Sequence, residues 1–206
     1  VELLPLAVEA VTEVTDVPLC LDSPNAAALR AALDVYEGKA LINSVNGEEE
    51  KLAQVLPLVK EYGAAVIGLT MDDSGIPSLS STCVAIATKI VKRAEALGIP
   101  REDVMIDCLA LAVCADCRTA VVTLDAIRGV REQLGVNMTL GGSNISFGLP
   151  DRESINDIYL AMTLLAGVDA PIVNPRRSRK AILIADLLLG RDEFGMAYVT
   201  YCRQRG

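Results

Sequence analysis

Residues 135–144 read Gly135-Val136-Asn137-Met138-Thr139-Leu140-Gly141-Gly142-Ser143-Asn144. A glycine of the kind that ends helices is followed by a short apolar run and then by a polar turn. The same unit recurs along the chain. It predicts strands at Pro18–Asp22, Ala40–Asn43, Ala64–Leu69, Val104–Asp107, Asn137–Gly141 and Ala170–Val173. Continuous apolar runs of this length are typical of parallel strands that are buried on both faces.

Helix signals lie between these strands. Glycines are predicted to close the helices at Gly38, Gly63, Gly98, Gly135, Gly167 and Gly190. Helix starts are predicted at Ser23, as an N-cap before Pro24, at the acidic first turn Glu48–Glu50, and at Asp151. The chain is therefore read as alternating strands and helices.

Six βα units predict either a (β/α)₈ barrel or an open, doubly wound sheet. No Gly-x-Gly-x-x-Gly turn follows a strand, which removes the best support for a dinucleotide-binding sheet. We expect one barrel domain over residues 1–206. A barrel usually needs about 250 residues, and the chain opens at Val1 within an apparent helix. The first two βα units are therefore expected to be missing. The apolar face predicted for that helix consists of Leu3, Leu6, Ala7, Ala10 and Val11.

Composition excludes several classes of function. The formal net charge of −8 disfavours nucleic acid, and neither a membrane-spanning run nor a signal peptide is visible, which favours a cytoplasmic protein. The absence of histidine excludes Ser-His-Asp hydrolysis and histidine-ligated zinc. The six cysteines are read as buried thiols. Cys114-Ala115-Asp116-Cys117, even with Cys108, offers three thiols where a closed zinc site needs four ligands, so no metal is predicted.

Polar side chains stand at the ends of four predicted strands: Asp22, Asn43, Asp107 and Asn144. Each alone is commonly a helix cap, but in a parallel barrel all four would face one mouth. Two carboxylates and two carboxamides offer many donors and acceptors, which suits a nitrogen-rich heterocycle.

Several segments together carry a family resemblance. They are Cys20-Leu21-Asp22-Ser23, Ile42-Asn43-Ser44-Val45-Asn46-Gly47-Glu48, Thr70-Met71-Asp72-Asp73-Ser74-Gly75-Ile76-Pro77, Ile106-Asp107-Cys108-Leu109 and Gly142-Ser143-Asn144-Ile145-Ser146-Phe147-Gly148-Leu149-Pro150. In this order the chain resembles the pterin-binding barrel of methyltetrahydrofolate:corrinoid methyltransferases, a family that includes the folate domain of cobalamin-dependent methionine synthase.

The resemblance implies a function and a set of roles. The N5-methyl group of 5-methyltetrahydrofolate would pass to the Co(I) corrinoid of a partner protein or domain, and the chain could form a homodimer. Asp22, Asn43 and Asp107 would hydrogen-bond the edge of the pterin. Asn144 would act near N5 as the catalytic group, and Arg152 would pack against the pterin unless it is simply an exposed arginine of a first helical turn.

Alternatives stay open at this point. Dihydropteroate synthase resembles the chain less, because that family continues with proline and a glycine-rich stretch where Cys108-Leu109-Ala110-Leu111 follows here. A non-catalytic folate-binding fragment is the other alternative. The loop Met71-Asp72-Asp73-Ser74-Gly75 is read as a solvated turn, or as a lid or partner contact over the pterin. The basic cluster Arg176-Arg177-Ser178-Arg179-Lys180 is read as a solvated helix start, or as a contact for the glutamate tail of folate or for an acidic partner surface.

Overall fold

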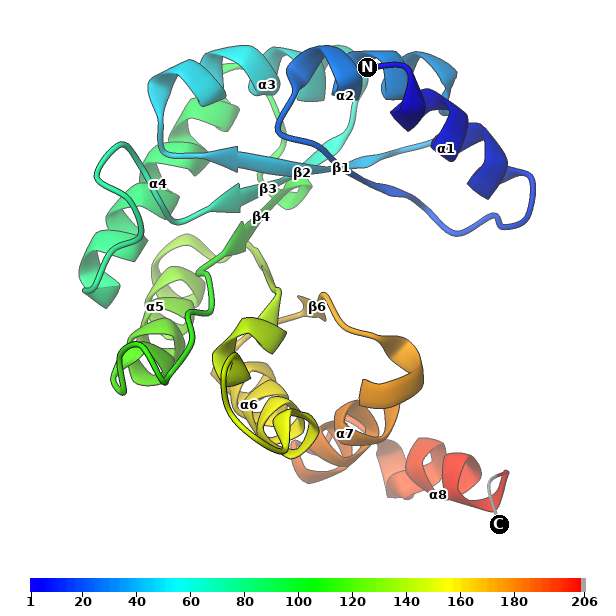
Figure 1. Ribbon diagram of the computed structural model, residues 1–206, viewed down its shortest axis with the longest axis vertical. Helices are drawn as coiled ribbons and strands as arrows, with labels where there is room; N and C mark the ends of the chain where they lie inside the picture. The colour runs from blue at the N-terminus through cyan, green and yellow to red at the C-terminus, as the bar shows by residue number, and fades with distance from the viewer. Residues whose placement is uncertain (205–206) are drawn as a thin grey trace.

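The computed structural model describes residues 1–204, in which one parallel sheet follows the order of the chain (Figure 1). Its strands are β1 (Cys20–Asp22), β2 (Leu41–Asn46), β3 (Ala65–Leu69), β4 (Val104–Asp107), β5 (Asn137–Leu140) and β6 (Ala170–Pro171). Every pair of neighbours is parallel. A doubly wound sheet reverses its strand order near the middle, and the order β1-β2-β3-β4-β5-β6 contains no reversal. The sheet is therefore the wall of a half-barrel.

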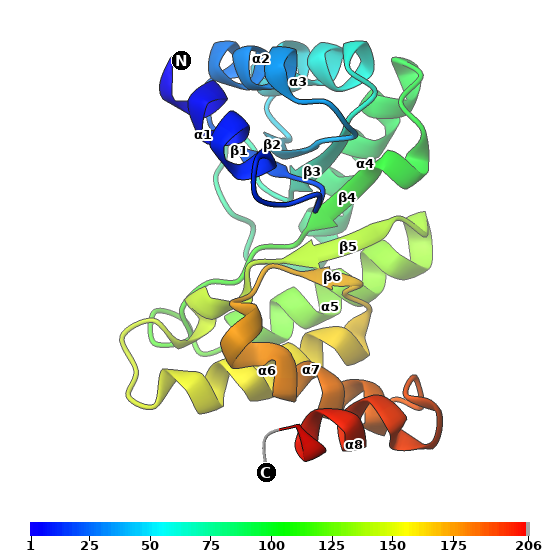
Figure 2. The same ribbon diagram turned by 90° about the vertical axis from the view of Figure 1, so that its right-hand side faces the viewer.

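The helices lie outside this wall. Figures 1 and 2 show them as an outer arc that follows the strands from the N-terminal to the C-terminal end of the chain. They are α1 (Leu3–Thr12), α2 (Ala26–Val35), α3 (Glu49–Glu61), α4 (Ser80–Ala96), α5 (Thr119–Leu134), α6 (Arg152–Ala166), α7 (Pro175–Leu188) and α8 (Met196–Arg203), with the short 3₁₀ helices η1 (Arg101–Asp103), η2 (Gly142–Ser146) and η3 (Glu193–Gly195). Within the described residues, no helix is long and apolar enough to cross a membrane.

The glycine signals correctly mark where helices end. All six predicted closing glycines have a positive φ, and Gly135, with φ 62°, is the left-handed cap of α5. Side chains with a Cβ rarely adopt this backbone conformation, so glycine at these points ends each helix at low cost.

Two helix starts differ from prediction. The cap of α2 is Asn25, whose Oδ1 accepts hydrogen bonds from the backbone N–H groups of Ala27 at 2.9 Å and Ala28 at 3.2 Å. Ser23 instead accepts from the N–H of Asn25 at 3.2 Å. Asp151 stands at the N-cap position of α6 but has φ 48° and makes no capping hydrogen bond.

Strand lengths differ from prediction by two or more residues at three places. β1 begins at Cys20 and not at Pro18. β2 extends to Asn46, because a register shift between Asn43 and Val45 lets the strand continue alongside β3. β6 contains only Ala170 and Pro171, because proline has no N–H with which to continue a ladder. Strands β2 to β5 form the centre of the sheet, and each buries one large apolar side chain completely: Ile42, Val66, Ile106 and Met138.

Two expectations about burial are wrong. Only Cys83 and Cys108 are buried thiols, while Cys20, Cys114, Cys117 and Cys202 are exposed. Helix α1 packs through Val8 and Leu4, and the predicted apolar residues Leu3, Leu6 and Val11 are exposed. The apolar residues of α1 do not lie on one side, so periodicity alone selected the wrong face.

Candidate functional site

The ends of β1 and β2 bring two predicted residues into contact. Asp22 and Asn43 are register partners on these neighbouring strands, and Asn43 Nδ2 donates to Asp22 Oδ2 at 3.1 Å. They line a cavity of about 200 Å³ together with Asn46 and Lys51. Because Asp22 is exposed and Asn43 half-buried, both side chains keep polar atoms that a ligand can reach.

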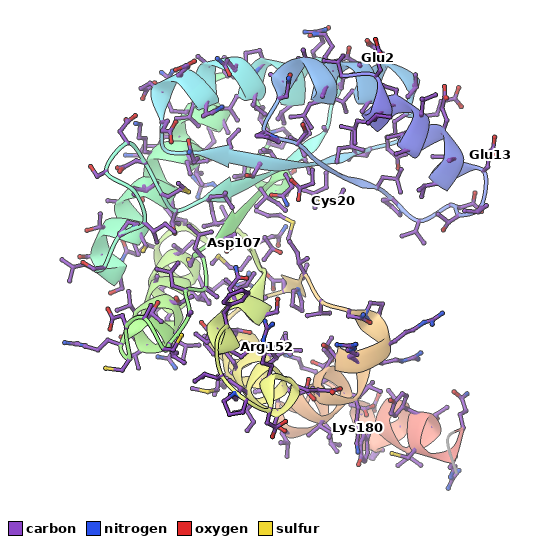
Figure 3. All side chains as sticks on the ribbon, in the orientation of Figure 1. Glu2, Glu13, Cys20, Asp107, Arg152 and Lys180 are labelled. Carbon is purple, nitrogen blue, oxygen red and sulfur yellow. The ribbon has the colours of Figure 1, made fainter. Side chains whose placement is uncertain are left out.

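Asp107 ends β4 and is 6% exposed (Figure 3). Its Oδ1 accepts from the N–H of Leu109 at 2.7 Å, and its Oδ2 accepts from the N–H of Gly141 at 3.2 Å. Leu109 has the unfavourable φ of 57°, and its carbonyl accepts from Thr123 Oγ1 at 2.9 Å. The carboxylate therefore fixes both its own loop and the start of the turn after β5. Each of its oxygens keeps a second lone pair that can accept another hydrogen bond.

Burial raises the pKa of the Asp107 carboxyl above its ordinary value of 3.8, although the N–H groups of Leu109 and Gly141 oppose the shift. A raised pKa in the folded state means that the stability from this group is present at low pH and is lost as pH rises through the folded pKa. Asp107→Asn has no titrating group at this position and serves as the reference. We expect the difference in unfolding free energy, wild type minus Asp107→Asn, to fall as the pH is raised from below 3.8. Denaturant unfolding at several pH values measures this difference, and a difference that grew with pH would contradict it.

Asn144 lies on η2, in the turn between β5 and α6, and is exposed. The turn is anchored by its next two residues, since Ile145 is 2% exposed and Ser146 is fully buried. Asn144 itself is exposed, so its carboxamide can be reached by a ligand and can both donate and accept hydrogen bonds.

Arg152 begins α6 and folds back over the same turn (Figure 3). Its Nη2 donates to the carbonyl of Ser143 at 2.9 Å, and its Nε donates to Ser146 Oγ at 3.0 Å. The guanidinium also lies over the ring of Phe147, 5.3 Å from its centre. Arg152 is exposed, yet these contacts make it part of the turn that carries Asn144.

A larger cavity, of about 510 Å³, lies beside Arg152 between the β5 turn, α6 and the start of α7. Its walls differ in polarity. On the α6 side are Glu153, Asp157 and Asn156, whose buried Oδ1 has no hydrogen-bond partner. Burial and the nearby Glu153 raise the pKa of the Asp157 carboxyl. On the α7 side are Arg177 and Ser178. Apolar residues complete the cavity: Leu140, Leu160, Ile172 and Val173.

The predicted residues thus form two groups, with Asp22 and Asn43 at the ends of β1 and β2, and Asp107, Asn144 and Arg152 around the turn after β5. Asp22 and Asn43 share the smaller cavity, Arg152 lines the larger one, and no residue lines both. Asp107 connects β4 to the turn of Asn144 through the N–H of Gly141. Several polar residues of the region had no predicted role, among them Lys51 in the smaller cavity, Ser146, which holds Arg152, and Asn156. The sequence offered only one signal for Ser146, its place as a polar residue inside the turn. It offered no signal for Asn156.

The remaining motifs occupy loops and one helix start. Asp72 and Gly75 form a turn in which Ser74 N–H donates to Asp72 Oδ1 at 2.9 Å. The basic cluster begins α7, where Asn174 caps the helix by accepting from the N–H of Arg176 at 3.0 Å. Within residues 1–204 no group of histidine, cysteine and acidic residues is arranged to hold a metal ion.

The half-barrel of parallel strands is the fold of the pterin binding enzymes. The sequence profile of the pterin binding enzyme family matches residues 2–174, and the chain belongs to this family. A solved structure of the dihydropteroate synthase of Yersinia pestis in complex with a sulfonamide drug has the same fold, with a TM-score of 0.72. At 15% identity it covers 91% of this chain and 72% of its own.

Of two similar proteins, one is a methyltransferase and the other is a methionine synthase. The methylcorrinoid:tetrahydrofolate methyltransferase of Eubacterium limosum is 30% identical over 98% of this chain and 77% of its own length. The methionine synthase of Mycobacterium leprae (strain TN) is 32% identical over 88% of this chain. The chain matches only 17% of the length of that synthase.

Proposed function

We propose that the protein transfers the methyl group between N5 of tetrahydrofolate and a corrinoid carried by a partner protein or domain. The observation that carries the proposal is the turn after β5, where the exposed Asn144 is anchored by Ile145 and Ser146 and covered by Arg152. It occurs in a member of the pterin binding enzyme family whose similar proteins include a methylcorrinoid:tetrahydrofolate methyltransferase.

Asp22, Asn43 and Asp107 would bind the pterin by its edge. The Asp22–Asn43 pair offers acceptors and donors on one side of the mouth, and the free lone pairs of Asp107 offer acceptors on the other. Such contacts orient the ring so that the methyl group faces the incoming metal, and orientation lowers the entropic part of the barrier. Arg152 would cover the ring from the β5 turn.

Asn144 would stabilise the reacting nitrogen. In the direction away from folate, the carbon–nitrogen bond of the methyl group breaks, its electron pair stays on N5, and a pair on Co(I) forms the new bond to carbon. N5 is a poor leaving group, so a hydrogen bond that strengthens as this pair develops accelerates the step. The same transition state serves both directions. The name of the Eubacterium limosum protein describes transfer from the methylcorrinoid to tetrahydrofolate, and the same site residues would serve that direction.

The larger cavity would receive the p-aminobenzoyl-glutamate tail of the folate. Its apolar wall suits the aromatic ring, Asn156 Oδ1 can accept from an N–H of the tail, and Arg177 can bind a carboxylate. Glu153 and Asp157 on the same wall would face the N–H groups of the tail and not its carboxylates.

The tail subsite predicts a difference between two ligands. 5-Methyltetrahydropterin, which lacks the tail, should bind about tenfold more weakly than 5-methyltetrahydrofolate, and Arg177→Gln should remove most of that difference because it removes a charge-assisted hydrogen bond. Calorimetric titration measures both constants. Lys180→Gln, an exposed position of α7 outside the cavity, is the control. Equal affinities for the two ligands in the wild type would contradict the subsite.

The proposed reaction is tested with 5-methyltetrahydrofolate and Co(I) cobalamin under anaerobic conditions. Protein-dependent loss of the Co(I) absorbance is the expected result. Folate binding without transfer would favour a non-catalytic folate-binding protein. Condensation of a pterin pyrophosphate with p-aminobenzoate would favour the dihydropteroate synthase alternative, whose fold this chain shares.

The wider setting of the reaction follows from the same proposal. We infer that residues 1–206 act as one pterin-binding barrel domain in the cytoplasm, that two further βα units complete a (β/α)₈ barrel, and that a homodimer forms. Sedimentation measures the dimer.

A further inference from the structure

The turn that carries Asn144 is held from two directions. Arg152 holds it from α6, through the carbonyl of Ser143 and the hydroxyl of Ser146. The loop between β4 and α5 holds it from the other direction. There, the N–H of Val113 donates to the carbonyl of Ile145 at 3.1 Å.

Cys114, the next residue of that loop, contacts the far end of the turn. Its thiol donates to the carbonyl of Phe147, with Sγ and O 2.9 Å apart. The N–H of Phe147 in turn donates to the carbonyl of Asn144 at 3.0 Å. The peptide groups on the two sides of Phe147 thus connect the thiol to the backbone of Asn144.

Gly148 shows that the sulfur fits this place closely. Gly148 has φ +82°, and a Cβ added to it would lie 3.2 Å from Cys114 Sγ. A side chain at position 148 would therefore press against the thiol. Cys114 occupies the space that a side chain at position 148 would fill. Cys117 is the second cysteine of the Cys-x-x-Cys motif, and its thiol makes no hydrogen bond of this kind within residues 1–204.

We propose that Cys114 is a positioning residue for methyl transfer, which fixes the turn of Asn144 by hydrogen-bonding the carbonyl of Phe147. The proposal rests on the proposed function for its effect on rate. It gives the Cys-x-x-Cys motif a role without a metal, a disulfide or a second thiol. Cys114 acts through Asn144 and does not itself touch the substrate.

Replacement of Cys114 separates the hydrogen bond from simple packing. Cys114→Ala should lower kcat for methyl transfer about fivefold, since it removes one net hydrogen bond from the turn, and should change KM for 5-methyltetrahydrofolate less than about twofold. Cys114→Ser keeps a hydroxyl donor and should recover kcat to within about twofold of the wild type. Cys117→Ala, at the exposed second cysteine, is the matched control and should leave kcat unchanged.

A second measurement does not depend on activity. The side-chain amide of Asn144, observed by ¹H–¹⁵N NMR, should shift in Cys114→Ala and return toward its wild-type position in Cys114→Ser. If the wild type transfers no methyl group, the proposed function fails, and these signals still decide whether Cys114 positions the turn. An unshifted amide in Cys114→Ala, or a serine variant as impaired as the alanine variant, would overturn the proposal.

Discussion

Asn144→Ala is expected to lower the rate of methyl transfer about 10²- to 10³-fold, the cost seen when a donor to a developing charge is removed. The dissociation constant for 5-methyltetrahydrofolate should change much less, because the bond to N5 strengthens only as the methyl group departs. Single-turnover measurements with Co(I) cobalamin give the rate, and calorimetric titration gives the affinity. The exposed position of Asn144 on η2 means that the fold should tolerate the change.

Ser143→Ala is the matched control for this prediction. Arg152 binds the backbone carbonyl of Ser143 and not its side chain, so the variant keeps the turn intact. It should transfer the methyl group at close to the wild-type rate. If Asn144→Ala instead lost its affinity for folate and kept the rate of the transfer step, Asn144 would be a binding residue and its catalytic role would be wrong.

Asp107→Ala is expected to weaken pterin binding and also to destabilise the fold. The substitution leaves the partly buried N–H groups of Leu109 and Gly141 without their acceptor, at a cost of about 1–2 kcal/mol for each group. Leu109 also loses the bond that supports its φ of 57°. We expect the unfolding free energy to fall by about 2–4 kcal/mol and folate affinity to fall at least about tenfold.

Denaturant unfolding followed by circular dichroism measures the first effect, and titration under conditions where the variant is folded measures the second. Asp125→Ala is the control, because Asp125 forms an exposed ion pair with Arg128 on α5 and pairs of this kind contribute little. A folded Asp107→Ala variant with unaltered folate affinity would remove Asp107 from the pterin site and leave it a purely structural role.

The sequence predicted what depends on neighbouring residues. Gly135 and the other closing glycines could be recognised because a left-handed cap is a local property of the chain. The parallel strands could be recognised from their apolar runs, and their order then follows from short connections between neighbours. Asp22 and Asn43 were predicted to share a mouth, and they do form a pair.

What could not be predicted depends on contacts between distant segments. The carboxylate of Asp107 meets the N–H of Gly141, and the thiol of Cys114 meets the carbonyl of Phe147, across more than 30 residues in each case. Nothing in the spacing of the residues encodes either contact. The choice of Asn25 over Ser23 as the cap of α2 failed for a different reason. Both residues are good caps, but the Ser23 hydroxyl accepts from the N–H of Asn25, so the helix begins only at Ala26 with Asn25 as its cap.

The two outer strands of the sheet differ in their capacity to accept a neighbour. β6 ends at Pro171, which has no N–H to offer along that border. β1 consists of Cys20, Leu21 and Asp22, each of which carries both a donor and an acceptor on its backbone. A strand that adds beside β1 therefore meets an edge without proline, whereas a strand that adds beside β6 finds no backbone donor at Pro171. The same asymmetry makes β1 the point at which the protein is most exposed to association through its edge.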